Sequence, residues 1–200
     1  MKKRVYELRN FYILWSTQGL SQLGSAMTNF ALTLWLYQTT GSALQTALLS
    51  ISSYAPYVLM SIFAGALSDR WDKKKTMLVC DTLAALCTIS VFILLKTGLL
   101  CVWHLYLLNV INGLMNTVQS PASDVAITMI TPKKYYQKTS AMRSFTGSLI
   151  TILHPMLATS LYALGGMNAV ILVDLSTFFI AFFVLSLGKN NESIAPTGNT

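Results

Sequence analysis

The feature that most constrains this chain is a run of 59 residues, positions 10–68, without a single Asp, Glu, Lys or Arg. Similar uncharged runs span residues 97–123, 144–173 and 175–188. A membrane-spanning helix needs about 20 apolar residues, so the first run alone is long enough for two spans and a turn. Only 10% of all residues are charged, against about 25% in soluble domains. The sequence therefore predicts an integral membrane protein and disfavours a soluble enzyme or a disordered chain.

Hydropathy and turn residues divide the chain into six predicted helical spans. They cover residues 11–37, 45–68, 76–95, 101–124, 140–163 and 167–187. The connections are short and either polar or glycine-bearing, as at 39–42 and at Gly165-Gly166. The prediction is an all-α integral membrane fold with an N-terminal segment (1–10), a six-helix transmembrane domain (11–188) and a polar tail (189–200).

The basic residues are distributed unequally between the two ends of these spans. Thirteen of the 14 Lys and Arg residues fall in the N-terminus, the second and fourth connections and the tail, which leaves Lys96 on the other side. Because positively charged loops stay in the cytoplasm, both termini are predicted to be cytoplasmic, in a plasma membrane such as a bacterial inner membrane. The net charge of +7 is then interpreted as contact with anionic membrane lipid rather than nucleic acid.

Polar side chains form stripes along the first, second, fourth and fifth spans when each is projected as a helix. An unsatisfied amide in hydrocarbon costs several kcal/mol, so these stripes must face other helices or water. We predict a shared cavity between them, shielded by the third and sixth spans; the alternative is a dry bundle joined by interhelical hydrogen bonds. The predicted substrate-cavity residues are Gln18, Gln22, Asn29, Tyr54, Tyr57, Asn109, Asn112, Asn116, Thr151 and His154.

The order of the striped spans indicates an internal repeat. Two striped spans are followed by a plain one, and the pattern recurs after about 95 residues, as in a 3+3 inverted repeat of a secondary transporter half. Pro56, Pro121 and Pro155 lie within striped spans, where proline removes an intrahelical hydrogen bond and kinks the helix.

Five acids and His154 lie in or beside the spans, and such ionisable groups are candidates for function. Asp81 and Asp124 are interpreted as structural, because both lie near the basic second connection. For Asp174 an ion pair and a functional role remain open. For His154 the open alternatives are a proton relay and a neutral, hydrogen-bonded imidazole. The three cysteines show no disulfide or metal-ligand spacing, and no metal or cofactor is predicted.

The strongest local motif lies between the second and third spans, where residues 65–75 read G-A-L-S-D-R-W-D-K-K-K. This segment resembles the G-x-L-x-D-R-x-G-R-K-x signature of the major facilitator superfamily, and the whole chain resembles the N-terminal six-helix half of such a transporter. Residues 54–57 and 120–122 resemble the macrolide-efflux branch. The resemblance implies a conformational latch in which Asp69 caps a helix of the other half and Arg70 pairs with Asp124. The latch residues are Gly65, Asp69, Arg70, Lys73, Lys74 and Asp124.

The resemblance implies efflux of amphipathic drugs by a secondary transporter, with protons as the candidate coupling ion. Two positions depart from the antiporter pattern: Asn112 stands where an arginine is common, and only Gly147 and Pro155 represent the usual glycine-proline motif. The expected partners are membrane lipid, a small-molecule substrate and a second six-helix half, supplied by the same gene, a separate chain or another copy. The tail, 189–200, resembles the start of the central linker.

Two other classes of function are alternatives to transport. A truncated or otherwise non-transporting six-helix membrane protein remains the main alternative to transport. An intramembrane enzyme is disfavoured because the sequence contains no H-E-x-x-H motif, no paired carboxylates and no nucleophilic serine in a G-x-S-G setting.

Overall fold

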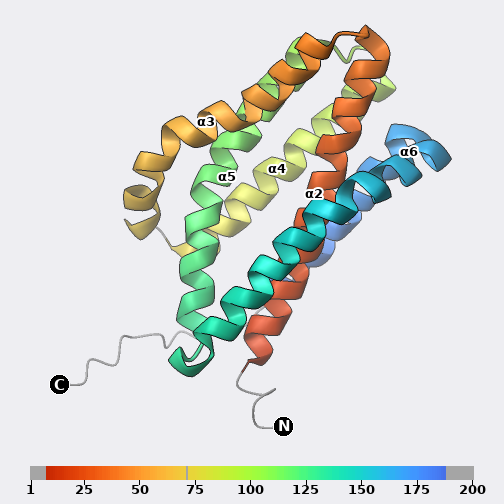
Figure 1. Ribbon diagram of the computed structural model, residues 1–200. Coiled ribbons are helices and arrows are strands. Elements are labelled where there is room, and N and C mark those ends of the chain that lie inside the picture. Colours follow the sequence, from red (N-terminus) through yellow and green to blue (C-terminus); the bar gives the residue numbers. More distant parts are fainter. Residues whose placement is uncertain (1–7, 71, 188–200) are drawn as a thin grey trace.

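The computed structural model describes residues 8–70 and 72–187, without the side chains of residues 9, 10, 62–70, 73, 74, 130 and 187. This described part is helical and contains no strand. Its elements are α2 (Arg9–Thr40), α3 (Ala43–Arg70), α4 (Lys73–Lys96), α5 (Val102–Ile130), the short 3-10 helix η1 (Lys133–Tyr135) and α6 (Tyr136–Leu187) (Figure 1).

Local backbone chemistry sets the ends of these helices. α2 stops at Gly41, which has φ 62° and donates its N–H to the Tyr37 carbonyl oxygen at 2.8 Å. Asp72 is the N-cap of α4, and its carboxylate accepts the Lys75 backbone N–H at 2.9 Å. Gly166 interrupts α6 with φ 62° and ψ −165°, a conformation that essentially only glycine adopts without strain. The chain turns back there (Figure 1), so α6 consists of a first arm, residues 136–165, and a second arm, residues 167–187.

Each of the six predicted spans overlaps one of these helices or arms, and the predicted connection at Gly165-Gly166 coincides with the interruption of α6. The largest difference lies in α5, which continues to Ile130 instead of ending at Asp124. The predicted span, 101–124, ended at the charged residue Asp124. The Asp124 side chain is instead 53% exposed and paired with Arg143, so the helix carries it without burying an isolated charge.

The helices do not pack side by side in the order of the sequence. α2 lies along α6, α3 lies along α5, and α4 contacts both α5 and α6 (Figure 1). The main apolar core includes Leu36, Leu105 and Val170, all fully buried. It lies at the end of the bundle that holds the α2–α3 and α4–α5 turns. A smaller apolar cluster that includes Leu8 and Ile127 lies at the opposite end, so the middle of the bundle is left for polar side chains.

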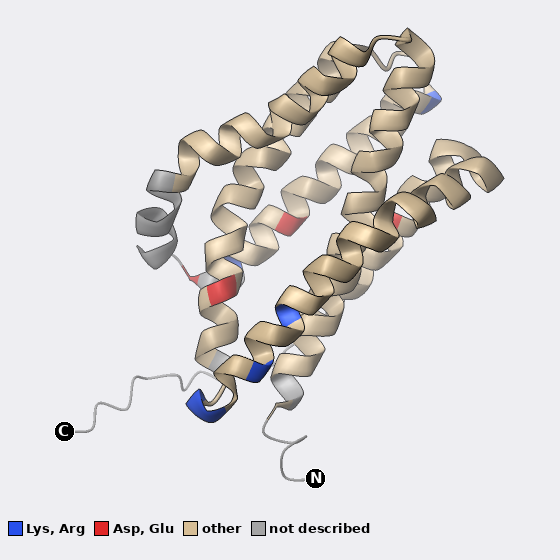
Figure 2. Ribbon diagram, in the orientation of Figure 1, with Lys and Arg blue, Asp and Glu red and all other residues tan. Residues whose placement is uncertain are grey.

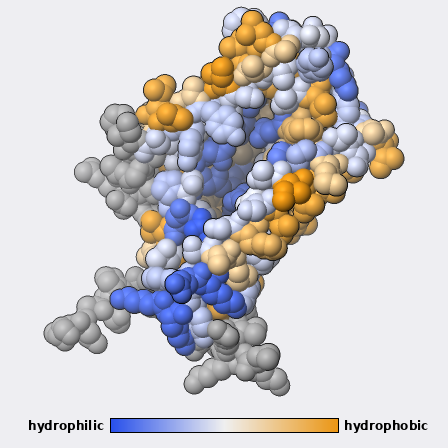
Figure 3. All heavy atoms as spheres, in the orientation of Figure 1, coloured by the Kyte–Doolittle hydropathy of each residue, from blue (hydrophilic) through white to orange (hydrophobic). Residues whose placement is uncertain are grey.

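The outer surface carries many large apolar side chains (Figure 3), including Leu164, 87% exposed, and Trp103, 79% exposed. Contiguous apolar surface of this kind marks contact with lipid or another protein. Two helical stretches in the described part are long and apolar enough to cross a membrane by length and composition, Lys75–Lys96 and Lys133–Ser186. The second has 54 residues, enough for two crossings of about 30 Å each. That α2, α3 and α5 also cross stays a prediction.

Candidate functional site

A polar cavity of about 400 Å³ lies in the middle of the bundle. Figure 3 shows it as a hydrophilic hollow flanked by apolar surface. Helices α2 to α6 all contribute to its wall. The residues lining this cavity, called the central cavity below, are Gln18, Ser21, Gln22, Ser25, Ala26, Thr28, Asn29, Tyr57, Asp81, Ala84, Thr88, Asn112, Asn116, Gln119, Ser120, Ser123, Arg143 and Asp174.

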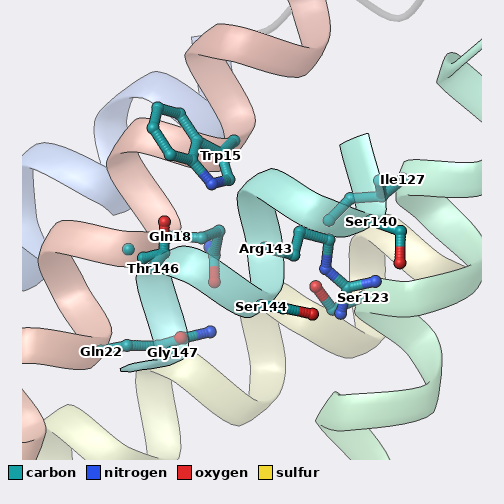
Figure 4. A pocket seen from close by; sticks show the side chains of 11 residues that line it. Trp15, Gln18, Gln22, Ser123, Ile127, Ser140, Arg143, Ser144, Thr146 and Gly147 are labelled. Atoms are coloured by element: carbon teal, nitrogen blue, oxygen red, sulfur yellow. The ribbon is translucent and has the colours of Figure 1, made fainter. Parts of the chain in front are cut away.

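A second cavity of about 350 Å³ adjoins the first on the side of the first arm of α6. The two cavities share Gln18, Gln22, Ser123 and Arg143, so they are neighbouring compartments of one polar cleft. Figure 4 shows Gln18 of α2 and Ser144 of α6 approaching the same space, with Arg143 extending toward Ser123 of α5. The cleft therefore lies between α2, α5 and the first arm of α6.

Asp81 of α4 is buried in the wall of the central cavity, between α2 and α5. Its carboxylate accepts a hydrogen bond from Nε2 of Gln18 at 3.3 Å and another from Nε2 of Gln119. Hydrogen bonds to a charged group are stronger than those between neutral groups. The sequence placed Asp81 near the basic connection as a structural acid, but its described partners are two cavity amides. The reason is that α4 begins at Lys73, which puts Asp81 two turns into the helix.

Asp174 lies in the second arm of α6 and is 3% exposed. Its carboxylate accepts from the Ser25 hydroxyl at 3.1 Å and from the Thr88 hydroxyl at 3.4 Å, which links α6 to α2 and α4. The backbones are close here, because a Cβ on Gly24 would lie 2.4 Å from Thr177 Oγ1 and 3.0 Å from Asp174 Oδ1. The described partners of Asp174 are therefore neutral hydroxyls, not the cation of an ion pair.

The structure gathers most of the predicted cavity residues in one wall. Those that line the central cavity are Gln18, Gln22, Asn29, Tyr57, Asn112 and Asn116. Asn109 is buried beside them, where its Nδ2 donates to the Leu105 carbonyl oxygen at 3.0 Å and its side chain borders a separate space of about 20 Å³. The amides of α2 and α5 thus converge, as the stripe pattern predicts.

Tyr54, Thr151 and His154 are not brought into either polar cavity. Tyr54 is 69% exposed, and Thr151 donates to the Gly147 carbonyl oxygen of its own helix at 2.9 Å. His154 Nδ1 lies 2.8 Å from the Ile150 carbonyl oxygen, and its ring packs edge to face on Phe30. This geometry fits the hydrogen-bonded histidine of the two alternatives left open by the sequence.

The sequence did not predict that α4 and the second arm of α6 contribute to the cavity. These segments were expected only to shield the cavity, yet Asp81, Thr88 and Asp174 line it. Each segment is largely apolar and lacks a continuous polar stripe, so its hydropathy does not indicate that it lines a cavity. The available signal was the spacing, since Asp81 and Thr88 lie two turns apart and therefore share one face of α4.

The predicted latch can be compared with the structure only at Asp124. Its carboxylate forms a close ion pair with the guanidinium of Arg143 on α6, and the two side chains are 53% and 36% exposed. Arg143 also lines both cavities, a role that the sequence analysis did not assign to it. The side chains of Gly65, Asp69, Arg70, Lys73 and Lys74 lie outside the described residues, so the latch stays a prediction.

Within the described residues, no three His, Cys, Asp or Glu side chains come together in a group that could hold a metal ion. Cys80, Cys87 and Cys101 are free thiols. The polar groups available in the cleft are amides, hydroxyls, the two carboxylates and one guanidinium. They suit reversible binding of a small molecule or ion.

Comparison with known proteins places this fold in a family. The chain is 27% identical over 192 residues to macrolide efflux protein A of Streptococcus pyogenes, covering 93% of this chain and 47% of that protein. It is 25% identical over 162 residues to macrolide efflux protein A of Enterococcus faecalis, covering 78% of this chain and 50% of that protein. A Bacillus subtilis protein described as an uncharacterized MFS-type transporter, YkuC, is 24% identical over 196 residues, covering 97% of this chain and 45% of that protein. The chain thus spans about half the length of these relatives, and no solved structure matches it.

The model of the Major Facilitator Superfamily matches residues 14–198. This match extends far beyond the motif at residues 65–75 and confirms the resemblance seen in the sequence. Membership in the family is consistent with a membrane-embedded transporter rather than an enzyme. The chain belongs to the Major Facilitator Superfamily, over a length that corresponds to about half of its curated relatives.

Proposed function

We propose that this chain is the N-terminal half of an efflux transporter that moves amphipathic, macrolide-like molecules by alternating access. The observation that carries the proposal is the central cavity of about 400 Å³, walled by amides, hydroxyls and Tyr57 inside a largely apolar bundle. Ligand sites of drug size are commonly about 300–1,000 Å³. The similarity to two macrolide efflux proteins supports the choice of substrate class.

The cavity wall has the chemistry that an amphipathic substrate requires. Gln22, Asn29 and Asn116 are exposed side chains that line the central cavity, so their amides are free to donate to or accept from a ligand. Tyr57, 40% exposed, supplies an aromatic surface at the same wall. A second six-helix half facing these side chains would complete the site, which is why that half remains the expected partner.

Repeated contacts support the predicted 3+3 inverted repeat. A Cβ on Gly19 of α2 would lie 3.2 Å from Thr146 of α6, and a Cβ on Gly113 of α5 would lie 2.2 Å from Ser53 of α3. Gly113 follows Gly19 by 94 positions, and Thr146 follows Ser53 by 93. The first helix of each unit therefore approaches the second helix of the other unit at equivalent positions, as a pseudo-two-fold axis requires.

The buried carboxylates follow the same relation. Asp174 comes 93 positions after Asp81, and Gln119 comes 94 positions after Ser25. Asp81 accepts from Gln119, while Asp174 accepts from Ser25. The third helix of each unit thus bonds to the first helix of the other unit, which gives a second, independent pair of contacts with the same offset.

The charge distribution supports the proposed orientation. The basic residues of the described part gather toward the end of the bundle that holds the connection from α5 through η1 to α6, whereas Lys96 ends α4 at the opposite end (Figure 2). Under the positive-inside rule the end with the gathered basic residues faces the cytoplasm. The proposed latch, in which Asp69 caps a helix of the second half and Arg70 pairs with Asp124, would then operate at the cytoplasmic face, next to the Arg143–Asp124 pair.

Drug accumulation in cells tests this function. A labelled macrolide is measured in cells that express the full chain alone and in cells that also express a C-terminal half from a macrolide efflux relative. We expect accumulation to fall severalfold when both halves are present, and the fall to disappear with Asn116→Leu. The matched control is Gln137→Leu, which removes an exposed amide outside both cavities.

The variants are compared with the wild-type chain only at equal amounts of protein in the membrane. Unchanged accumulation of macrolides and of other amphipathic drugs under both conditions would contradict efflux. It would instead favour the remaining alternative, a non-transporting membrane protein.

A further inference from the structure

The two buried carboxylates of the bundle border one small space. A cavity of about 20 Å³ beside the central cavity is lined by Ser21, Ser25, Asp81, Thr88 and Asp174, with apolar side chains closing the remainder. Asp81 is 8% exposed and Asp174 is 3% exposed. A polar space of about 10–15 Å³ is enough for one water molecule. The space therefore accommodates a single particle the size of a water molecule or a dehydrated ion.

The charges around this space are not balanced within the described residues. The described partners of the two carboxylates are amides and hydroxyls, all of them neutral. Arg143 is the described cationic side chain that lines the adjoining central cavity, and its guanidinium is paired with Asp124. Buried carboxylates without a compensating charge are costly. A water molecule would not offset two ionised carboxylates, whereas a bound cation would, as would a proton taken up by either group.

The oxygen chemistry favours the Asp174 side as the main binding point. A hydroxyl can rotate to turn a lone pair toward a cation, whereas an amide NH2 group carries only donors. Asp174 is surrounded by the Ser25 and Thr88 hydroxyls, while Asp81 is held by amide NH2 groups. In addition, Thr28 is 4% exposed, lines the central cavity and lies beside the Asp174 carboxylate.

We propose that a sodium ion binds between Asp174 and Asp81, coordinated chiefly by the Asp174 carboxylate and the hydroxyls of Ser25, Thr88 and Thr28. Hard cations prefer oxygen ligands of this kind. The volume admits one small ion and the charges favour a cation. The ion would tie α2, α4 and α6 together next to the central cavity. Sodium binding by the chain does not depend on the proposed efflux function. A role of sodium as the coupling ion does rest on that function.

The test uses the full chain purified into lipid nanodiscs. Radioactive sodium binding is measured at fixed pH, with choline chloride keeping the ionic strength constant. The thermal unfolding midpoint is recorded over the same sodium series. We expect saturable sodium binding and a sodium-dependent rise of the midpoint in the wild-type chain. Asp174→Asn should weaken binding at least tenfold, and Thr28→Val, which changes no charge, should weaken it severalfold.

Ser176→Ala is the matched control, because Ser176 is exposed on the same arm and its hydroxyl bonds to the Leu172 carbonyl oxygen. It should bind sodium as the wild type does. The proposed site would be refuted if the unfolding midpoint were the same in sodium and in choline. It would also be refuted if Asp174→Asn and Thr28→Val bound sodium as strongly as the wild type. A midpoint that follows pH but not sodium would overturn it as well, since the occupant would then be a proton. Sodium binding without any drug export would refute the efflux proposal and leave the sodium site standing.

Discussion

Replacing Gly113 by alanine tests the close approach of α5 to α3. A Cβ at this position would lie 2.2 Å from the Ser53 carbonyl oxygen and 3.1 Å from its carbonyl carbon. Both are backbone atoms of a neighbouring helix, so no side-chain rotation can relieve the contact and the helices must separate. Gly147 in the first arm of α6 offers a matched control, because a Cβ there would meet nothing within 4 Å.

Two opposing effects set the expected magnitude. Alanine favours a helix over glycine by about 1 kcal/mol, which acts equally at both positions. Overpacking costs about 1–3 kcal/mol, and a clash with fixed backbone belongs at the upper end of that range. We therefore expect Gly113→Ala to lose about 2 kcal/mol of unfolding free energy, which corresponds to a midpoint about 4–8 °C lower in a chain of this size. Gly147→Ala should unfold at or slightly above the wild-type temperature.

Thermal unfolding of the purified chains in the same detergent or nanodisc, followed by tryptophan fluorescence, measures both variants. Gly19 makes the repeat-related contact with α6. Gly19→Ala should cost less than Gly113→Ala, because the added Cβ would face a side-chain methyl of Thr146 at 3.2 Å rather than a backbone atom at 2.2 Å. A midpoint for Gly113→Ala equal to or above that of the wild type would refute the packing on which this reasoning rests.

Two further experiments probe the polar side chains. Gln119→Leu removes one of the two described donors to Asp81 and should lower the unfolding free energy by about 1.5–3 kcal/mol; a double-mutant cycle with Asp81→Asn should recover much of that loss, and strict additivity would speak against the bond. Arg143→Ala and Asp124→Ala break a pair that is 36% and 53% exposed, so their coupling in denaturation should be about 0–1 kcal/mol; a coupling well above that range would show a pair shielded from water.

Much of the helical framework could be predicted from the sequence. The uncharged runs and the glycine-bearing connections predicted where helices lie, because a helix satisfies its own backbone and leaves its mark in local composition. The family was also accessible, since the motif at residues 65–75 is a local pattern. The amides at Gln18, Gln22, Asn112 and Asn116 could be assigned to a cavity because an amide stripe is visible on a single helix.

Other features depended on which helices meet. Tyr54 and His154 share faces with polar neighbours in sequence, yet neither reaches the cleft, because position on a helix face does not say what lies opposite. For the same reason, the position of Asp81 in the sequence did not predict which side chains bind its carboxylate. Its amides come from α2 and α5, at separations of 63 and 38 residues.

By itself, the sequence determined that this chain forms long apolar helices, that their basic ends gather on one side and that amides line some of their faces. Those properties are local, since they follow from residue type and helical periodicity. Only the tertiary structure decided that Asp81 and Asp174, on two otherwise apolar segments, border one small space and that Arg143 pairs with Asp124. A charged side chain is stable in a buried position only when other segments bring hydrogen-bond donors or an opposite charge to it. Which segments do so depends on how the helices pack.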